Sequence, residues 1–306
     1  MNPPAPVPLL DSPLVRAVRF LPAWVGHRRG YRLADRIARL ADPRLRGVKR
    51  VRHPWGEMAY DLDSYVERLM AYELFGEELG ALIGLLLRPG DTAVEAGMHI
   101  GSMAVRMLER VGPTGRLIGF EASPPMLARL EKNLALNPAM APRCTIHRAA
   151  LHEEAGRTVT FYCDERGIDS TLASTPQARA VEVPTTTFDA TLAEAGPVRF
   201  MKMDIEGAEV LALRGGQRWL GSRDRPDFIL SEINDPMLRR LGSSAEELFA
   251  LFLAHGYRPL EVEWAGRGQR LRARAVPHTH RFPENADLLL CRDEEREREL
   301  MAALGA

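Results

Sequence analysis

The chain has 306 residues, of which 45% are hydrophobic and 27% are charged, and its formal net charge is zero. This composition is typical of an ordinary soluble protein with a sizeable core. Three widely spaced cysteines without a CxxC pair argue against a disulfide framework or a structural zinc site, and no apolar run approaches the roughly 20 residues of a membrane span. We therefore expect a cytoplasmic protein.

Positive charge is concentrated near the N-terminus. From Arg16 to Arg52 there are twelve lysines and arginines but two acids, Asp35 and Asp42. Within this segment, Tyr31 to Ala41 has the spacing of an amphipathic helix with a cationic rim. The segment could make peripheral contact with an anionic membrane, or the helix could pack on the main domain and leave a solvated basic face. Met1 to Pro13 is proline-rich and predicts no regular structure.

A hairpin and a long helix are predicted next. Val48 to Leu62 reads as two short strands with a turn at Pro54-Trp-Gly56. Ser64 to Leu87 has apolar residues at helical spacing and is followed by Pro89-Gly90, a clean stop. We divide the chain into an N-terminal basic extension, residues 1–72, and a main domain, residues 73–306.

From there the chain alternates strand and helix, which is typical of a parallel sheet. The first strand ends at Val94, and the next predicted strands are Arg116–Phe120, Cys144–Ala149, Phe200–Asp204 and Asp227–Ile233. The predicted helices are Ser102–Val111, Pro124–Leu136, Ile205–Leu213, Ala245–His255 and Glu294–Leu304.

Two regions depart from this alternation. Thr158–Cys163 and Ala180–Pro184 predict an antiparallel excursion around the polar segment Asp164–Gln177. Near the C-terminus, Tyr257–Trp264 and Ala286–Cys291 are strands separated by an arginine-rich connection. Because that connection has no helical pattern, we expect those two strands to pair antiparallel.

The turn after the first strand indicates the class of ligand. In an open parallel sheet, ligands bind at the carboxyl ends of the strands, so Glu95, Gly97 and Glu121 should converge there. A dinucleotide needs G-x-G-x-x-G, but Met98 and His99 follow Gly97, and Glu95 would repel a pyrophosphate by about 1 kcal/mol or more per close charge pair. A cationic adenosyl cofactor suits these groups, since Glu121 can accept both ribose hydroxyls and Glu95 lies near an ammonium or sulfonium. The residues predict S-adenosylmethionine.

Five segments of the chain also carry a resemblance to a known family. They are Val94-Glu-Ala-Gly-Met-His-Ile-Gly101, Thr114-Gly-Arg-Leu-Ile-Gly-Phe-Glu-Ala-Ser-Pro124, Asn133-Leu-Ala-Leu-Asn137, Thr185-Thr-Thr-Phe-Asp189 and Met201-Lys-Met-Asp-Ile-Glu-Gly-Ala-Glu-Val-Leu-Ala-Leu-Arg-Gly-Gly216. Together they resemble the FkbM-type methyltransferases. The most specific segment is Lys202-Met-Asp-Ile-Glu-Gly-Ala-Glu209, because a long ordered motif rarely arises by chance.

The resemblance implies a fold, an activity and a cofactor. The fold is the α/β, Rossmann-like, class I S-adenosylmethionine-dependent methyltransferase sheet, with seven mostly parallel strands and an antiparallel last strand. Members are mostly O-methyltransferases that act on hydroxyls of sugars, polyketides or related natural products. Their usual first motif is Asp-x-Gly-Ala-Asn-x-Gly, and this chain has Glu95, Met98 and His99 at the Asp, Ala and Asn positions. The predicted cofactor-binding residues are Glu95, Gly97, His99, Gly101, Glu121 and Ala149.

A hydroxyl acceptor must lose a proton as it is methylated, so a base should lie at the carboxyl edge of the fourth or fifth strand. Asp204 and Glu232 have these positions and are the predicted catalytic residues, although Asp204 could instead cap the next helix. Glu206 and Glu209, expected in the first turn of that helix, could join them around a divalent cation, but their spacing also suits helix capping and we predict no metal. Ser170-Thr171 could contact the acceptor.

The leading hypothesis is an O-methyltransferase for a hydroxyl of a sugar, glycolipid or natural product, with no nucleic-acid partner. One alternative is a non-catalytic S-adenosylmethionine-binding module that docks to a membrane or polymer through the basic N-terminus. Another is a nicotinamide dehydrogenase. Titration with each cofactor, followed by turnover assays on candidate acceptors, separates the three. The sequence predicts neither the individual acceptor nor the oligomeric state.

Overall fold

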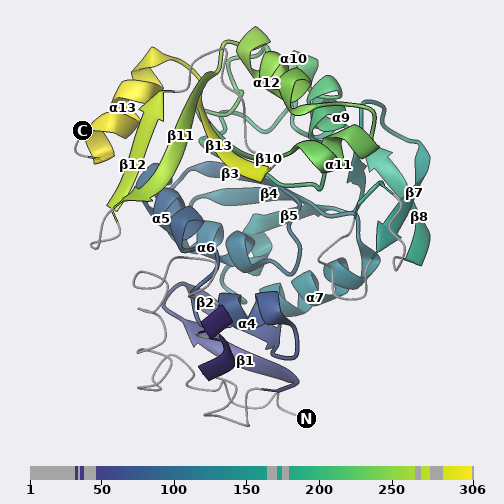
Figure 1. Ribbon diagram of the computed structural model, residues 1–306, viewed down its shortest axis with the longest axis vertical. Helices are drawn as coiled ribbons and strands as arrows, with labels where there is room; N and C mark the ends of the chain where they lie inside the picture. The colour runs from purple at the N-terminus through teal and green to yellow at the C-terminus, as the bar shows by residue number, and fades with distance from the viewer. Residues whose placement is uncertain are drawn as a thin grey trace.

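The central sheet determines where the functional residues lie. The computed structural model describes residues 32–33, 35–37, 46–163, 171–173, 179–265, 270–275 and 285–304. The strands of the central sheet are β3 Thr92–Ala96, β4 Arg116–Phe120, β5 Cys144–His147, β9 Phe200–Met203, β10 Phe228–Asn234, β11 Arg258–Ala265, β12 Arg270–Ala275 and β13 Asn285–Cys291. Within the described part of the chain, they are arranged in the order β12-β11-β13-β10-β9-β3-β4-β5 (Figure 1).

The sheet is parallel in its centre and antiparallel at one end. Strands β10, β9, β3, β4 and β5 run parallel to one another, whereas β13 is antiparallel to both β10 and β11. This confirms the predicted mostly parallel, Rossmann-like sheet with an antiparallel last strand. The arginine-rich connection contributes a strand that was not predicted, β12, which pairs antiparallel with β11 and adds an eighth strand at the edge.

Side chains along the strands alternate between two cores, one on each face. Ala93 and Phe200 belong to the core that α5, α6 and α7 cover, and Val94 and Met201 belong to the core that α9 and α12 cover. Figure 1 shows these helices on opposite sides of the sheet. The helices are α5 Glu77–Leu86, α6 Ser102–Val111, α7 Pro124–Ala135, α8 Phe188–Thr191, α9 Glu209–Arg214, α10 Gln217–Leu220, α11 Asp235–Arg240, α12 Ala245–Ala254 and α13 Glu294–Leu304.

The long helix predicted from Ser64 to Leu87 is wrong, because the structure has two helices there: α4 (Tyr65–Ala71) and α5. The Leu74 N–H donates to the Leu69 carbonyl and the Glu73 N–H to the Met70 carbonyl. Glu73 has φ +55°. This is a Schellman closure with glutamate at the left-handed position that glycine usually takes. Gly76, with φ +80°, is then the N-cap of α5 and marks the break that the apolar periodicity runs through.

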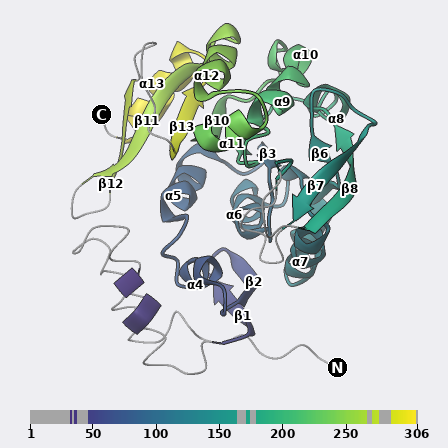
Figure 2. The same cartoon turned by 45° about the vertical axis from the view of Figure 1, so that its right-hand side comes forward.

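The N-terminal hairpin packs against the main domain. Strands β1 (Val48–His53) and β2 (Gly56–Asp61) pair antiparallel as predicted, and they lie with α4 next to α6 and α7 (Figures 1 and 2). Met58 and Tyr60 are fully buried in the same core as α6. The division of the chain at residue 72 stays a prediction.

The basic segment before the hairpin is described only in part. Residues 32–33 and 35–37 are helical, in agreement with the predicted amphipathic helix. Asp35 accepts from the Arg68 side chain of α4 at 2.6 Å, which ties this short piece to the rest of the fold. The prediction for Met1 to Pro13 lies outside the described residues.

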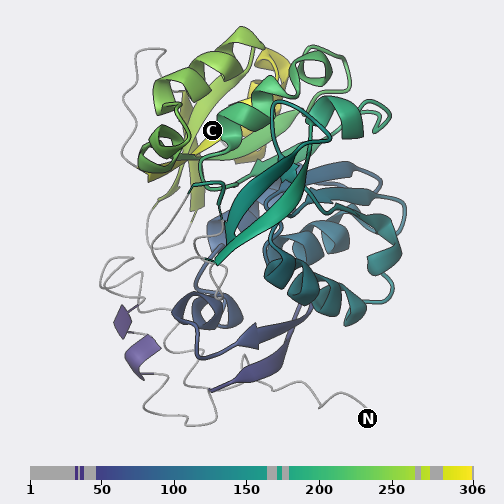
Figure 3. The ribbon, with the colours of Figure 1, turned by 90° about the vertical axis from the view of Figure 1, so that its right-hand side faces the viewer.

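The predicted antiparallel excursion forms a second, smaller sheet. Its strands are β6 Ala150–Leu151, β7 Thr158–Cys163 and β8 Arg179–Thr186, and their order is β6-β8-β7. Because the chain leaves the main sheet to pair with β8, β5 ends at His147, two residues earlier than predicted. Figure 3 looks onto this side of the molecule, with β7 and β8 in front of the main sheet.

Two expectations from composition concern membranes and disulfides. Among the described residues, no helix combines the length and the apolarity that crossing a membrane requires. The three cysteines, Cys144, Cys163 and Cys291, are free thiols. A disulfide framework is therefore excluded, as the cysteine spacing predicted.

Candidate active site

Strand alternation brings a group of charged side chains to one corner of the sheet. Lys202 in β9 is the register partner of Glu95 in β3, and Glu232 in β10 is the register partner of Asp287 in β13. Asp204 follows β9 directly. Since residues two apart on a strand lie on the same face, Glu95, Lys202 and Glu232 share the face of Ala93, Phe200 and Leu230, which α5 and α6 cover.

The turn after β3 passes very close to the end of β9. Gly97 has φ +85°, and a Cβ on it would lie 1.9 Å from the carbonyl oxygen of Asp204. His99 has φ +52°, in the left-handed region where histidine and asparagine are enriched among non-glycine residues. This tolerance explains how the imidazole replaces the usual asparagine. Gly101, with φ +87°, precedes α6 as its N-cap.

A gap in β4 accommodates the second bulky residue of this turn. Met98 is 1% exposed, and a Cβ on Gly119 would lie 2.1 Å from the Met98 sulfur. The methionine therefore fills the space that the missing side chain of Gly119 leaves free. The departures from the usual first motif at Met98 and His99 are thus accommodated without breaking the turn.

Glu121 organises the turn from the end of β4. Its carboxylate accepts the backbone N–H of His99 at 2.7 Å and that of Ser123 at 2.8 Å. Burial raises the pKa of Glu121 to about 7, while these N–H groups pull the pKa down. Because a carboxylate oxygen has more than one acceptor position, Glu121 can still accept ribose hydroxyls.

The His99 imidazole is a neutral group. Burial lowers its pKa to about 4, so it carries no proton charge at neutral pH. Glu67 of α4 and Arg129 of α7 lie on one side of it and are bound to each other, with Arg129 Nη1 2.7 Å from Glu67 Oε1. His99 is thus suited to hydrogen bonding and unsuited to holding a carboxylate by charge.

Glu95 is a buried acid with an unused oxygen. It is 1% exposed, and its Oε2 has no hydrogen-bond partner among the described residues. Burial raises its pKa to about 8, with further contributions from Asp204 and Glu121 that oppose the effect of Lys202. Leaving a buried carboxylate oxygen unpaired is unfavourable by about 1–3 kcal/mol or more, and a cationic ligand group would relieve it.

Asp204 and Glu232 form a pair of carboxyl groups beside this lysine. Lys202 Nζ donates to Asp204 Oδ2 at 2.8 Å, and Glu232 shares a hydrogen bond with Asp204. Burial acts to raise the pKa of Asp204, but the Lys202 charge and hydrogen bond outweigh it and lower the pKa. Burial and the neighbouring Asp204 raise the pKa of Glu232 to about 9. The directions of these two pKa shifts favour an ionised Asp204 and a protonated Glu232 at neutral pH.

The segment after Asp204 differs from the prediction. Helix α9 begins at Glu209, so Glu206 does not lie in its first turn but in a preceding turn with φ +54°. Glu209 Oε1 accepts the Ile205 N–H at 3.0 Å in the turn before the helix, whereas the N-cap of α9 is Ala208, without a side-chain capping bond. The Thr171 hydroxyl donates to the Glu206 carbonyl at 2.8 Å and is fully buried. Thr171 therefore braces this turn, and Ser170 lies outside the described residues.

The acids of this corner also meet the spacing of a cation site. Carboxylate oxygens of Asp204, Glu206 and Glu232 lie within 4.8 Å of one another. Asp204, however, already binds Lys202 and shares a proton with Glu232. Because the Lys202 ammonium already lies against Asp204 Oδ2, where a cation would add a second positive charge, we assign no metal to the cluster.

The predicted cofactor residues fit an adenosyl sulfonium cofactor. Glu95 and Glu121 lie at neighbouring strand ends, and the charge of Glu121 contributes to raising the pKa of Glu95. The orphaned oxygen of Glu95 suits a cationic group, and Glu121 suits a ribose. Ala149 lies in the bend between β5 and β6 and is half-buried, at the carboxyl end of the next strand along.

Sequence reasoning assigned no role to Lys202. The signal was available, because Lys202 is two residues before Asp204 on a predicted strand and therefore on the same face. The pair formed by Glu67 and Arg129, 2.7 Å apart, was also missed. No sequence pattern connects these two residues, which lie 62 positions apart and meet because α4 packs near α7.

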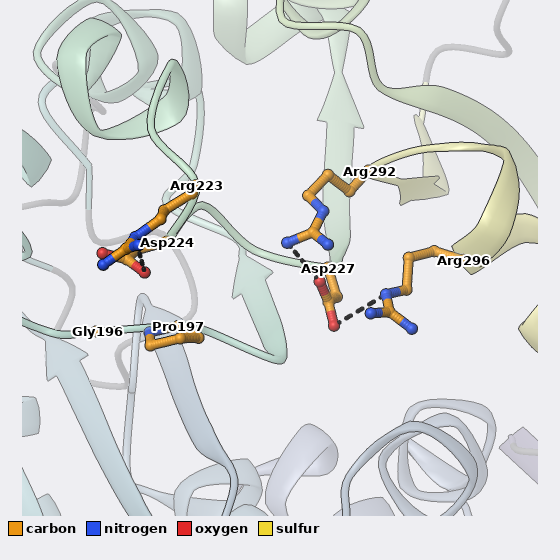
Figure 4. Close-up of a pocket in the computed structure, with 7 residues that line it drawn as sticks. All are labelled: Gly196, Pro197, Arg223, Asp224, Asp227, Arg292 and Arg296. Carbon is orange, nitrogen blue, oxygen red and sulfur yellow. Dashed lines mark ion pairs between the residues drawn. The ribbon is translucent and has the colours of Figure 1, made fainter.

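A cavity at the opposite edge of the sheet has a different character. It has a volume of about 470 Å³ and lies where β9 and β10 begin. Figure 4 shows Asp227 between Arg292 and Arg296, with ion pairs of 2.8 and 3.1 Å. Because its charged groups are paired and it lies at the amino ends of the strands, this cavity is separate from the corner that holds Asp204.

Comparison with known proteins adds a family and several relatives. The profile of the methyltransferase FkbM domain matches residues 95–259. The 31-O-demethyl-FK506 methyltransferase FkbM of Streptomyces tacrolimicus is 25% identical over 243 residues, which cover 69% of this chain and 89% of the relative.

Solved structures with a similar arrangement are more distant. A SAM-dependent O-methyltransferase from Thermotoga maritima is 13% identical, with a TM-score of 0.40 and coverage of 80% of this chain and 85% of the other. An O-methyltransferase from Bacillus cereus in complex with SAH is 12% identical, with a TM-score of 0.40 and coverage of 70% and 78%.

Proposed function

This chain belongs to the FkbM methyltransferase family, and we propose that it transfers a methyl group to a hydroxyl oxygen of a sugar, glycolipid or natural-product acceptor. It is an S-adenosylmethionine-dependent methyltransferase, as the family match over residues 95–259 indicates. The observation that carries the hydroxyl acceptor is the pair of carboxyl groups of Asp204 and Glu232, whose oxygens lie within 4.8 Å of each other with Lys202 Nζ 2.8 Å from Asp204 Oδ2, beside the predicted cofactor residues.

We propose that Glu95, Gly97, His99, Gly101, Glu121 and Ala149 bind the cofactor. When bound, S-adenosylmethionine supplies an electrophilic methyl group on a cationic sulfur. Glu121 would accept hydrogen bonds from the ribose, and the Glu95 oxygen that has no partner among the described residues would face a positively charged group of the cofactor. Gly97 keeps the turn close to Asp204, which would hold the methyl group near the acid pair.

The acid pair then acts on the acceptor. As the acceptor oxygen bonds to the methyl carbon, the carbon–sulfur bond breaks, its electron pair stays on sulfur, and the hydroxyl proton must leave. Asp204 is ionised at neutral pH and can receive that proton. Glu232, through their shared hydrogen bond, stabilises the charge on Asp204 before transfer. Both groups also orient the hydroxyl, and positioning provides much of the rate in such displacements.

The relative from Streptomyces tacrolimicus supports the class of acceptor. Its name describes methylation of an oxygen of 31-O-demethyl-FK506. A hydroxyl of a natural product is thus the acceptor type that this chain should be tested on first, with neutral sugars and glycolipids beside it.

The proposal is tested by methyl transfer from isotopically labelled S-adenosylmethionine to a panel of hydroxyl acceptors, with products identified by mass spectrometry. Asp204→Asn should lower kcat by about 100-fold or more, since general-base catalysis contributes about that factor, with cofactor affinity changed far less. Asp227→Asn, at the other edge of the sheet, is the control and should leave kcat intact. Cofactor binding without transfer to any hydroxyl would favour the non-catalytic module, and an unchanged kcat in Asp204→Asn would remove that residue from the reaction.

A further inference from the structure

We propose that Lys202 is a positioning residue for methyl transfer, which keeps Asp204 ionised and oriented while leaving Glu95 free for the cationic part of the cofactor. The inference rests on the proposed function and names a residue that the proposal does not use. Lys202 touches neither acceptor nor cofactor in this scheme, and it acts through Asp204.

The position of Lys202 on β9 gives it two acidic neighbours. Its side chain is 12% exposed, and Nζ lies 2.8 Å from Asp204 Oδ2, two residues further along the chain. Across the sheet its register partner is Glu95 on β3. No ion pair forms between Lys202 and Glu95, so the lysine binds one acid and only faces the other. Because only Asp204 binds the lysine, the two carboxyl groups have different protonation states.

The surroundings of Lys202 are dominated by acids from every neighbouring element. They are Glu95 on β3, Glu121 after β4, Asp204 after β9, Glu206 and Glu209 in the following turn and helix, Glu232 on β10 and Asp287 on β13. The nearby His99 is neutral, and Arg129, the cation on its other side, is bound to Glu67. Among the side chains that the structure describes, Lys202 is therefore the cation bound to one of these acids, and the acid that it binds is Asp204.

The effect of the lysine differs among its neighbours. Burial raises the pKa of Glu95 to about 8 and that of Glu232 to about 9, and neither acid has an ion pair with a side chain that the structure describes. Asp204 experiences burial as well, yet its pKa is lowered because Lys202 binds it. Without the lysine, burial would act on the pKa of Asp204, whose side chain is 38% exposed, with no bound cation to oppose it, and that pKa would rise. A larger fraction of Asp204 would then be protonated and unable to take a proton from the acceptor.

The experiment replaces Lys202 in the full-length enzyme and measures kcat against pH at saturating cofactor. Lys202→Gln keeps a hydrogen-bond donor for Asp204 but removes the charge. In Lys202→Gln, kcat should fall at acidic pH. It should be at least tenfold below wild type at pH 6.5 and should recover toward pH 9. Lys202→Arg restores the charge and should return the wild-type profile.

Arg199→Met is the matched control. Arg199 lies on the approach to the same strand, is 11% exposed, and is paired with Asp227 at the opposite edge. Its loss should reduce thermal stability without changing the shape of the pH profile. Equal loss of kcat in Lys202→Gln at every pH would reduce Lys202 to a structural residue and overturn the proposal.

A second readout needs no acceptor. The titration of the Asp204 carboxyl, followed by carbon-13 NMR, should shift upward by more than one pH unit in Lys202→Gln. If this shift appears while wild-type enzyme methylates no hydroxyl, the electrostatic role of Lys202 stands and the proposed acceptor class fails. If the Asp204 titration does not move, the role of Lys202 is refuted whichever acceptor is used.

Discussion

The acids at the two edges of the parallel strands lie in opposite electrostatic environments. At the amino edge, Asp227 pairs with Arg199, Arg292 and Arg296, and Glu299 of α13 pairs with Arg199 and Arg296. These arginines outweigh burial and lower the pKa of Glu299. At the carboxyl edge, Glu95, Glu121, Glu209 and Glu232 have raised pKa values because burial removes them from water without a cation bound to them.

The difference separates structural charges from functional ones. A buried acid that is matched by arginines helps to fix α13 against the sheet. A buried acid without a matching cation destabilises the folded protein, and such groups persist where a ligand or a reaction uses them. The unmatched acids at the carboxyl edge of β3, β9 and β10 therefore support the proposal that the cofactor and the acceptor bind there.

The largest expected effect is on cofactor affinity. Glu121→Ala removes the acceptor of the ribose hydroxyls and of the His99 N–H, and hydrogen bonds to charged groups contribute about 1.5–3 kcal/mol each. We expect the dissociation constant for S-adenosylmethionine to rise about 10- to 100-fold or more by calorimetry. Glu299→Ala, the counterpart at the amino edge, should lower the melting temperature and leave this affinity unchanged. Equal affinity in both variants would remove Glu121 from the cofactor site.

A smaller effect concerns the pH dependence of binding. Glu121 and Glu95, with pKa values of about 7 and about 8, are largely protonated below those values and bind a cationic cofactor best when ionised. Affinity should therefore rise between pH 6 and pH 9, by up to about tenfold per pH unit where one group titrates. Glu95→Gln should weaken binding at pH 9 and flatten the upper part of the curve. Calorimetry in buffers of different ionisation enthalpy would detect the accompanying proton release, and its absence in wild type would contradict this assignment.

The smallest effect is on stability, and its sign differs between the edges. The pKa of Glu232 is raised to about 9 in the folded protein, whereas the pKa of an unfolded glutamate is about 4.3. Between these two pH values the folded state holds a proton that the unfolded state has lost. Stability should fall as pH rises through that window. Glu232→Gln cannot ionise and should be more stable than wild type by about 1–2 kcal/mol near pH 9, with little difference near pH 5.

Glu299→Gln provides the opposite case. Because the pKa of Glu299 is lowered, its stabilising effect is present above the unfolded value and is lost as pH falls. Glu299→Gln should therefore be less stable than wild type at pH 7, with the difference vanishing at acidic pH. Denaturant titrations at several pH values measure both variants, and the same sign for both would contradict the contrast between the edges.

Much of the fold could be predicted from the sequence because strands and helices here follow their own periodicity. The predicted bounds of α6, β4 and β7 are those of the structure. The break between α4 and α5 was missed because Glu73 closes the first helix in a left-handed conformation that its residue type rarely adopts. Gly76, the N-cap of α5, was the available sequence signal for it. Strand β12 follows no apolar pattern and forms by pairing with β11.

The site was predicted in outline for a similar reason. Residues that follow strands are easily located, which is why Glu95, Glu121 and Asp204 were expected at one edge. The states of these acids were not predictable, because they depend on burial and on contacts between elements. Lys202 bonds Asp204, and Glu232 shares a proton with it. The roles of these residues in cofactor binding and catalysis stay predictions.

The two asparagines of α7 have a consequence for how the chain is made. Asn133 accepts the Ala59 N–H at 2.8 Å, and Asn137 both accepts from Glu57 and donates to it, at 2.9 and 2.7 Å. These contacts complete the outer edge of β2 from positions 74 and 80 residues later. During synthesis, the hairpin emerges from the ribosome long before its partner helix, and its open edge waits for α7. In a variant that folds slowly, mispairing should therefore occur first at this edge, where β2 can pair with the wrong strand. Chaperone binding to the incomplete chain should also occur there.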